Sequence, residues 1–166
     1  MKSHMNSVAQ LLSSNRVLLD LDVPNKQALF EVVGLLWEVH RGIVAAEVVD
    51  SLNAREKLGS TGLGKGVAIP HARVKGLAEA IAAFVRLKVP IEFNSPDGNP
   101  VSDCFVLLVP EQPTERHMQI LADIAKMLSK GQFRDQLGAS KSRDEIHQLF
   151  AASSETRLPA AASNLP

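Results

Sequence analysis

Residues 101–109 (VSDCFVLLV) constrain the fold most strongly, because they are apolar almost throughout from Cys104 onward. A run of this kind predicts a central β-strand that is covered on both faces. Two more strands are expected at 17–21 and 80–88. Helical spacing and capping residues predict helices at 7–13, 28–41, 45–58, 115–130, 133–137 and from 143 onward. Because strands and helices intermix along 166 residues, the sequence predicts one α/β domain.

The charge balance and the cysteine content exclude several classes of protein. Lys plus Arg equals Asp plus Glu, at 18 each, so no net field attracts nucleic acid or an anionic membrane. The sequence shows no signal peptide and no apolar stretch long enough to span a bilayer, which predicts a cytoplasmic protein without membrane insertion. The single cysteine, Cys104, allows no internal disulfide and is expected to be a buried thiol.

Both ends of the sequence are set apart from the predicted domain. Residues 1–5 (MKSHM) resemble an expression scar. Residues 153–166 are small, polar or Pro, which predicts a disordered tail. The expected domain therefore covers residues 6–152.

Residues 59–66 (GSTGLGKG) contain four glycines, which predicts a tight loop and not a helix. The spacing Gly59-x-x-x-x-Gly64-Lys65 approaches a P-loop, but Gly66 replaces the Ser or Thr that binds magnesium. The order of elements is also reversed, since this loop follows a helix and leads into an extended segment. Two interpretations stay open, an anion-binding nest of backbone N–H groups or a plain tight connection.

His71 follows this loop and the extended segment 67–70, at the tip of an element whose backbone is restricted by Pro70. An unperturbed imidazole has a pKa of about 6.5, so it presents a neutral, nucleophilic nitrogen at neutral pH. A structural or merely exposed histidine is the alternative.

His117 is expected on the buried face of the 115–130 helix. It lies one turn before Leu121 and on the same face as Ile124 and Leu128, so its imidazole should point towards the sheet. His117 is then either a functional group or a core histidine bonded to a backbone carbonyl.

Arg55 continues an apolar helix stripe in the same way. Val48 and Leu52 precede it by about one turn each, and Arg55 lies in the last turn before the glycine loop. Its guanidinium either extends to solvent or meets an anion, and its fork geometry suits a phosphate.

Metal and hydrolase chemistry find little support in these residues. His71, His117 and Cys104 could in principle bind zinc, but no pair of them has a recognised ligand spacing, so no metal and no other cofactor is predicted. A serine hydrolase is not supported, because no Gly-x-Ser-x-Gly elbow occurs.

The residues around His71 resemble a known family. The run Arg55-Glu56-x-x-Gly59-Ser60-Thr61-Gly62-x-Gly64-x-Gly66-Val67-Ala68-Ile69-Pro70-His71 is similar to the active-site signature of the mannitol/fructose-type enzyme IIA domains of the bacterial phosphoenolpyruvate-dependent phosphotransferase system. Residues 115–121 (ERHMQIL) resemble the second histidine motif of that family. The similarity covers about residues 7–152. The stand-alone nitrogen-regulatory branch is the nearest match, because no enzyme IIB, IIC or HPr segment is attached.

The resemblance implies a mixed five-stranded sheet with helices on both faces. It also implies that His71 is phosphorylated on Nε2, that His117 donates a hydrogen bond to the phosphoryl group, and that Arg55 stabilises its charge. Further phosphate-binding donors are expected from the loop: Ser60, Thr61 and Gly62. Three departures from the family pattern, at Lys65, Ala72 and Arg73, bear on partner docking more than on the chemistry.

The implied function is that of a phosphohistidine carrier. It would accept phosphate from an HPr-like protein and regulate targets such as transporters or sensor kinases by its phosphorylation state. Three alternatives stay open: an enzyme IIA that relays phosphate to an enzyme IIB, a binding module whose His71 is never phosphorylated, and a metal-dependent hydrolase.

Overall fold

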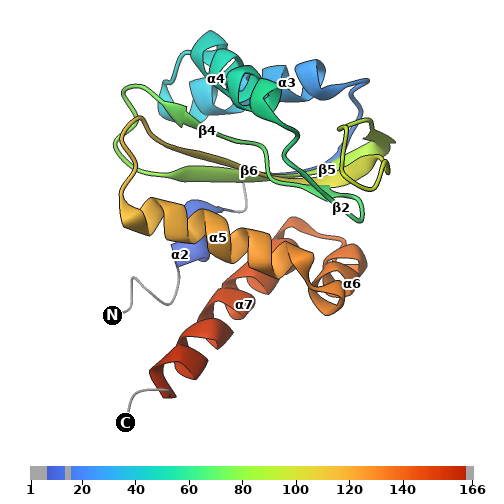
Figure 1. Ribbon diagram of the computed structural model, residues 1–166, viewed down its shortest axis with the longest axis vertical. Coiled ribbons are helices and arrows are strands. Elements are labelled where there is room, and N and C mark those ends of the chain that lie inside the picture. The colour runs from blue at the N-terminus through green and yellow to red at the C-terminus, as the bar shows by residue number, and fades with distance from the viewer. Residues whose placement is uncertain (1–6, 14–15, 164–166) are drawn as a thin grey trace.

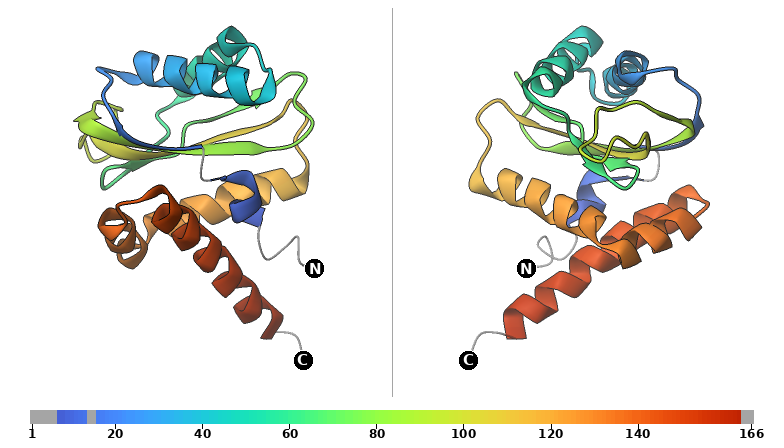
Figure 2. Two further views of the ribbon diagram at one scale, coloured as in Figure 1. Left: turned by 180° about the vertical axis from the view of Figure 1, so that it is seen from behind. Right: turned by 45° about the vertical axis from the view of Figure 1, so that its right-hand side comes forward.

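One mixed β-sheet separates two layers of helices (Figure 1). The computed structural model describes residues 7–13 and 16–163. One face of the sheet is covered by α3 (Lys26–Arg41) and α4 (Ala45–Leu58). Four helices lie on the opposite face, as both views in Figure 2 show: α2 (Ser7–Leu11), α5 (Glu115–Ser129), α6 (Gly131–Ala139) and α7 (Arg143–Ser163). The predicted α/β class is therefore confirmed.

The sheet is built around β6 (Val101–Pro110), which is the strand predicted from the apolar run. On one side, β5 (Ile81–Ile91) pairs with β6 in antiparallel fashion, and β1 (Val17–Leu21) lies parallel to β5. On the other side, β3 (Val67–Ala68) and β4 (His71–Val74) pair one after the other in parallel with β6. The remaining strand, β2 (Gly62–Gly64), pairs with β3 in antiparallel fashion.

The described residues thus form six strands, where the resemblance implied five. The difference lies in residues 62–74. A loop and a single extended segment were predicted there, whereas the structure has three short strands. Strands of two to four residues carry too little apolar periodicity to be recognised in a sequence, and here they form because β6 offers them a partner.

The helix boundaries on the α3–α4 side follow from local residues, as predicted. Asn25 caps α3 by accepting a hydrogen bond from the Ala28 N–H at 2.9 Å. Gly42 ends α3 in the left-handed conformation, with φ 70°. α4 ends at Gly59. These caps place Arg55 and Glu56 at the C-terminal end of α4, beside the sheet edge that carries β4.

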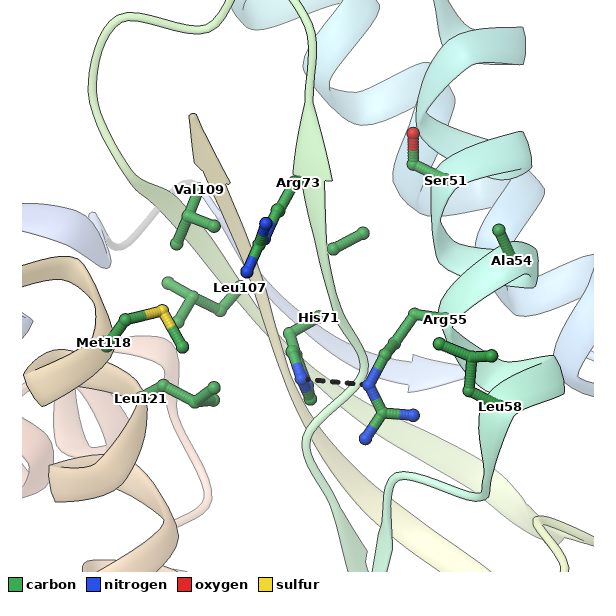
Figure 3. A pocket seen from close by; sticks show the side chains of 11 residues that line it. Ser51, Ala54, Arg55, Leu58, His71, Arg73, Leu107, Val109, Met118 and Leu121 are labelled. Carbon is green, nitrogen blue, oxygen red and sulfur yellow. Dashed lines mark hydrogen bonds between the residues drawn. The ribbon is translucent and has the colours of Figure 1, made fainter. Parts of the chain in front are cut away.

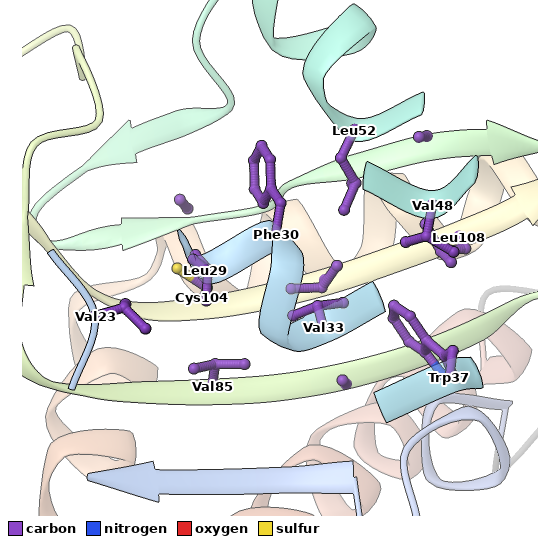
Figure 4. Close-up of a cluster of buried hydrophobic side chains, with 14 of the residues drawn as sticks. Val23, Leu29, Phe30, Val33, Trp37, Val48, Leu52, Val85, Cys104 and Leu108 are labelled. Carbon is purple, nitrogen blue, oxygen red and sulfur yellow. The ribbon is translucent and has the colours of Figure 1, made fainter. Parts of the chain in front are cut away.

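Two hydrophobic clusters lie on either side of the sheet. The cluster beneath α3 and α4 contains Cys104 and the large side chains Phe30 and Trp37 (Figure 4). Burial raises the pKa of the Cys104 thiol well above its usual range, so it is the inert, reduced group that was predicted. The opposite cluster centres on Phe150 of α7.

The C-terminal helix extends further than the predicted domain. α7 runs to Ser163 and so overlaps the segment 153–166 that was predicted to be a tail outside the domain. The predicted expression scar at 1–5 and residues 164–166 lie outside the described residues. Within the described residues, no helix is both long and apolar enough to cross a bilayer.

Candidate functional site

His71 is the first residue of β4, where the chain resumes its pairing with β6 after Pro70. The backbone of Leu107 holds both sides of this junction, because its N–H donates to the Pro70 carbonyl at 2.9 Å and its Cα is the register partner of His71. The imidazole Nδ1 lies 2.8 Å from the Ile69 carbonyl oxygen. Since a carbonyl only accepts, Nδ1 carries the proton and Nε2 keeps its lone pair.

Arg55 reaches the other ring nitrogen. Its Nε donates to His71 Nε2 at 3.3 Å, and its Nη1 donates to the Gly59 carbonyl at 2.8 Å (Figure 3). The guanidinium therefore does not simply extend to solvent. It lies against the imidazole nitrogen that keeps its lone pair.

The surroundings of His71 favour its neutral form. Burial lowers the pKa of His71 most strongly, and the Arg55 charge lowers it further. The hydrogen bond to the Ile69 carbonyl and the Glu56 charge act in the opposite direction, but the net pKa lies below 6.5. An unprotonated nucleophile is therefore present at neutral pH.

His71 faces an open cavity of about 370 Å³ between α4 and α5 (Figure 3). Apart from His71, Arg55 and Arg73, its lining is mostly apolar: Ala54, Leu58, Ala72, Leu107, Val109, Met118 and Leu121. Leu58 is 84% exposed and Met118 is 43% exposed, so large apolar side chains lie at the surface beside the imidazole. An exposed apolar surface of this kind is typical of a docking site for another protein.

His117 lies elsewhere than the sequence suggested. Its Nδ1 accepts a hydrogen bond from the Thr114 N–H at 3.0 Å, which turns the ring back towards the start of α5 and completes a capping box. His117 lines a second cavity, of about 570 Å³, together with Arg41 and Arg116. The α5 residues that line the His71 cavity are Met118 and Leu121.

The capping box nevertheless leaves His117 with one usable donor. Because Nδ1 accepts from a backbone N–H, the neutral ring carries its proton on Nε2. Helical periodicity had placed His117 at the head of the buried stripe, but it could not reveal that a histidine at the third helical position can cap its own helix.

The loop residues Ser60, Thr61 and Gly62 do not direct their donors at His71. Thr61 donates from its hydroxyl and its backbone N–H to the Glu56 carboxylate, at 2.7 and 2.9 Å. The Ser60 hydroxyl donates to the Phe93 carbonyl and accepts from the Gly62 N–H. A Cβ on Gly62 would clash with the Ser95 hydroxyl, so this glycine permits a close packing contact. The loop is therefore a tight connection whose donors are already bonded to neighbouring residues.

Glu56 was not among the predicted site residues, although its carboxylate accepts hydrogen bonds from Thr61 and Lys26 beside the site. A polar residue beside Arg55 in the signature was the available signal. Within the described part of the chain, no three His, Cys, Asp or Glu side chains converge as metal ligands, so His71, His117 and Cys104 do not form a zinc site there.

Residues 10–153 match the family model described as "Phosphoenolpyruvate-dependent sugar phosphotransferase system, EIIA 2". The chain belongs to this family. As an EIIA protein it is a phosphocarrier component of the phosphotransferase system.

Its similarity to nitrogen regulatory EIIA proteins is extensive. It is 38% identical over 146 residues to the nitrogen regulatory protein of Pseudomonas aeruginosa, which covers 87% of this chain and 95% of that one. The crystal structure of nitrogen regulatory protein IIA-Ntr from Neisseria meningitidis superposes with a TM-score of 0.82 at 43% identity and covers 86% of this chain and 98% of that one. The chain is thus a homologue of nitrogen regulatory EIIA proteins.

A more distant structure shares the fold. The IIA-Mtl protein of Escherichia coli, solved in complex with phosphorylated enzyme IIB-Mtl, has a TM-score of 0.69 at 18% identity, over 86% of this chain and 99% of that one.

Proposed function

We propose that this protein accepts a phosphoryl group on Nε2 of His71 from a phosphohistidine of an HPr-like protein, and that its phosphorylation state regulates target proteins in the cytoplasm. The observation that carries the proposal is the fixed tautomer of His71, whose Nε2 lone pair faces Arg55 at an apolar surface. A carrier needs this combination of a neutral nucleophile, an adjacent cation and a surface on which a donor protein can dock.

The transfer step requires little covalent assistance from the protein. The Nε2 lone pair attacks phosphorus, the new N–P bond forms as the donor's N–P bond breaks, and the donor imidazole departs with the bonding electrons. The Nδ1–H group continues to donate its hydrogen bond to the Ile69 carbonyl, and this bond stabilises the positive charge that develops on the ring. The Arg55 guanidinium exchanges its hydrogen bond to Nε2 for hydrogen bonds to the phosphoryl oxygens, whose charge it neutralises.

His117 and the loop are proposed in supporting roles. The Nε2–H of His117 is the donor available from α5, and its use requires a shift of the ring relative to the cavity beside His71. Thr61 and Ser60 support the phosphoryl site by fixing the loop. Gly62 allows the loop to pack against Ser95.

The regulatory role is supported by relatives that are 38% and 35% identical to this chain and are named a nitrogen regulatory protein and a nitrogen regulatory protein homolog. Phosphorylation adds about two negative charges beside Leu58 and Met118, which is sufficient to weaken an apolar contact with a target such as a transporter or sensor kinase. Relay to an enzyme IIB is the second candidate, because a relative with the same fold forms a complex with its phosphorylated IIB.

The direct test is incubation with a phosphorylated HPr-like donor, followed by intact-mass measurement and treatment with acid. Wild-type protein should gain one acid-labile phosphate, and His71→Ala should gain none. Labelling that persists in His71→Ala would refute the assignment. A wild-type protein that is never labelled would support a pure binding module.

A further inference from the structure

A buried carboxylate lies directly behind the site. Glu56 follows Arg55 in the last turn of α4, and its side chain is only 8% exposed. It accepts hydrogen bonds from the Thr61 hydroxyl at 2.7 Å, the Thr61 N–H at 2.9 Å and the Lys26 ammonium at 3.0 Å. The carboxylate thus joins the start of α3, the end of α4 and the loop that precedes β2.

These bonds continue through the backbone to His71. The Thr61 carbonyl accepts from the Ile69 N–H at 3.0 Å, and the Ile69 carbonyl accepts from His71 Nδ1 at 2.8 Å. From the other direction, Arg55 precedes Glu56 in the chain and donates to His71 Nε2. Hydrogen bonds and the intervening backbone therefore connect Glu56 to both nitrogens of the imidazole.

Lys26 forms an ion pair with this buried carboxylate. Its ammonium also donates to the Phe93 carbonyl at 3.2 Å and lies 4.8 Å from the centre of the Phe93 ring. The Lys26 ammonium is therefore held by Glu56, by the Phe93 carbonyl and by the Phe93 ring. An ion pair held in this way keeps its partners in place more strictly than an exposed ion pair does.

We propose that Glu56 is a positioning residue of the phosphoryl-transfer site, which fixes Thr61 and thereby orients the ring of His71 against Arg55. This inference rests on the proposed function of His71. Glu56 touches neither the reacting nitrogen nor the phosphoryl group, so it acts only through Thr61, Ile69 and Arg55.

The electrostatic surroundings of His71 supply a readout that a merely structural residue would not move. The charged groups that face His71 are Arg55 and Glu56 of α4 and Arg73 of β4, whereas α5 contributes the uncharged Met118 and Leu121. The Glu56 charge raises the pKa of His71. Its removal should therefore lower that pKa further.

The experiment compares Glu56→Gln with Glu145→Gln. Glu145 is the control of the same residue type: it accepts hydrogen bonds from the backbone N–H groups of Lys141 and Ser142, but it is exposed and lies on α7. Imidazole ¹⁵N NMR of the unphosphorylated proteins gives the pKa and tautomer of each histidine, and the donor assay gives the transfer rate. Glu56→Gln should lower the pKa of His71 and slow transfer by roughly tenfold to a hundredfold, whereas Glu145→Gln should do neither.

A folded Glu56→Gln variant with the wild-type pKa of His71 and the wild-type transfer rate would overturn the proposal. If Glu56→Gln does not fold, Thr61→Val carries the test, because it keeps the carboxylate and removes only the hydroxyl donor. Transfer should then be slower, and an unchanged rate would overturn the proposal as well. The NMR comparison needs no donor, so it remains decisive on positioning even if wild-type His71 is never phosphorylated.

Discussion

At the scale of single residues, the chemistry of the site depends on which nitrogen of His71 carries a proton. The Ile69 carbonyl fixes the proton on Nδ1, and burial lowers the pKa of the ring. Arg55 then occupies the side of Nε2 without protonating it, because a guanidinium keeps its protons throughout the physiological range. The ring is neutral, oriented and flanked by a cation before any donor arrives.

This arrangement predicts a specific pH dependence of transfer to His71. Because the pKa of His71 is lowered from 6.5, Nε2 should remain unprotonated as the pH falls through 6.5, and the rate should decrease only in more acidic solution. The measurement is the labelling rate with saturating donor between about pH 5 and 8, corrected for hydrolysis of the donor alone. A rate that is already halved at pH 6.5 or above would contradict the lowered pKa.

The same shift has a consequence for folding. The unfolded chain, with its higher pKa for His71, binds the proton more readily than the folded protein does. The contribution of this group to the free energy of unfolding is therefore present above the unfolded pKa and is lost as the pH falls below it. His71→Ala should show a weaker loss of stability under acid than the wild type in urea denaturation, and an identical loss would contradict the assignment.

His71 and Arg55 could be predicted as site residues because each belongs to a local sequence pattern. Arg55 continues a helical apolar stripe, and His71 follows a glycine loop and a proline. Glu56 could not be predicted in this way. Its role depends on Thr61 and Lys26 folding onto it from two other segments, and a charged residue near a helix end is ordinarily solvated.

At the scale of the elements, His117 caps the helix to which it belongs, α5. The Thr114 hydroxyl accepts from the His117 N–H at 3.4 Å, while His117 Nδ1 accepts from the Thr114 N–H. Any variant of His117 therefore changes the helix cap together with the imidazole.

Thr114→Ala separates the two roles of His117. It removes one half of the capping box and keeps the imidazole, so it should lower the free energy of unfolding by roughly 1 kcal/mol and leave transfer close to wild type. His117→Ala should show a similar loss of stability and, in addition, slower transfer to His71. Urea denaturation and the donor assay measure the two effects. Equal transfer rates in His117→Ala and Thr114→Ala would remove His117 from the mechanism.

The elements predicted from the sequence were those of five residues or more. Asn25, Gly42 and the apolar run before Pro110 define their own boundaries through capping or periodicity. The short strands at 62–74 depend on β6 as a partner, and a local sequence pattern carries no record of a partner so distant in the chain.

At the scale of the whole molecule, the site draws on both faces of the sheet, because Arg55 comes from α4 whereas Met118 and Leu121 of α5 line the same cavity. Arg55 and Glu56 approach His71 from the α3–α4 side. The opposite cluster is organised by Phe150, which is fully buried and lies with its ring centre 5.8, 5.1 and 5.2 Å from those of Phe84, Phe105 and Phe133. None of these rings takes part in the hydrogen bonds that hold His71, so substitutions in the aromatic cluster should change stability more than the chemistry of the imidazole.

Phe150→Ala tests this expectation. The substitution removes a buried ring and leaves a cavity beneath the sheet, so the free energy of unfolding should fall by about 3–5 kcal/mol in urea denaturation. Leu35→Ala on α3, where the side chain is 58% exposed, is the control and should change stability by no more than roughly 0.5 kcal/mol. Because Phe150 takes no part in the hydrogen bonds that hold His71, the pKa of His71 in folded Phe150→Ala should match the wild type. A shift in that pKa would show that the aromatic cluster and the site are coupled through β6, whose Leu107 packs into the same cluster as Phe150 and also lines the cavity beside His71.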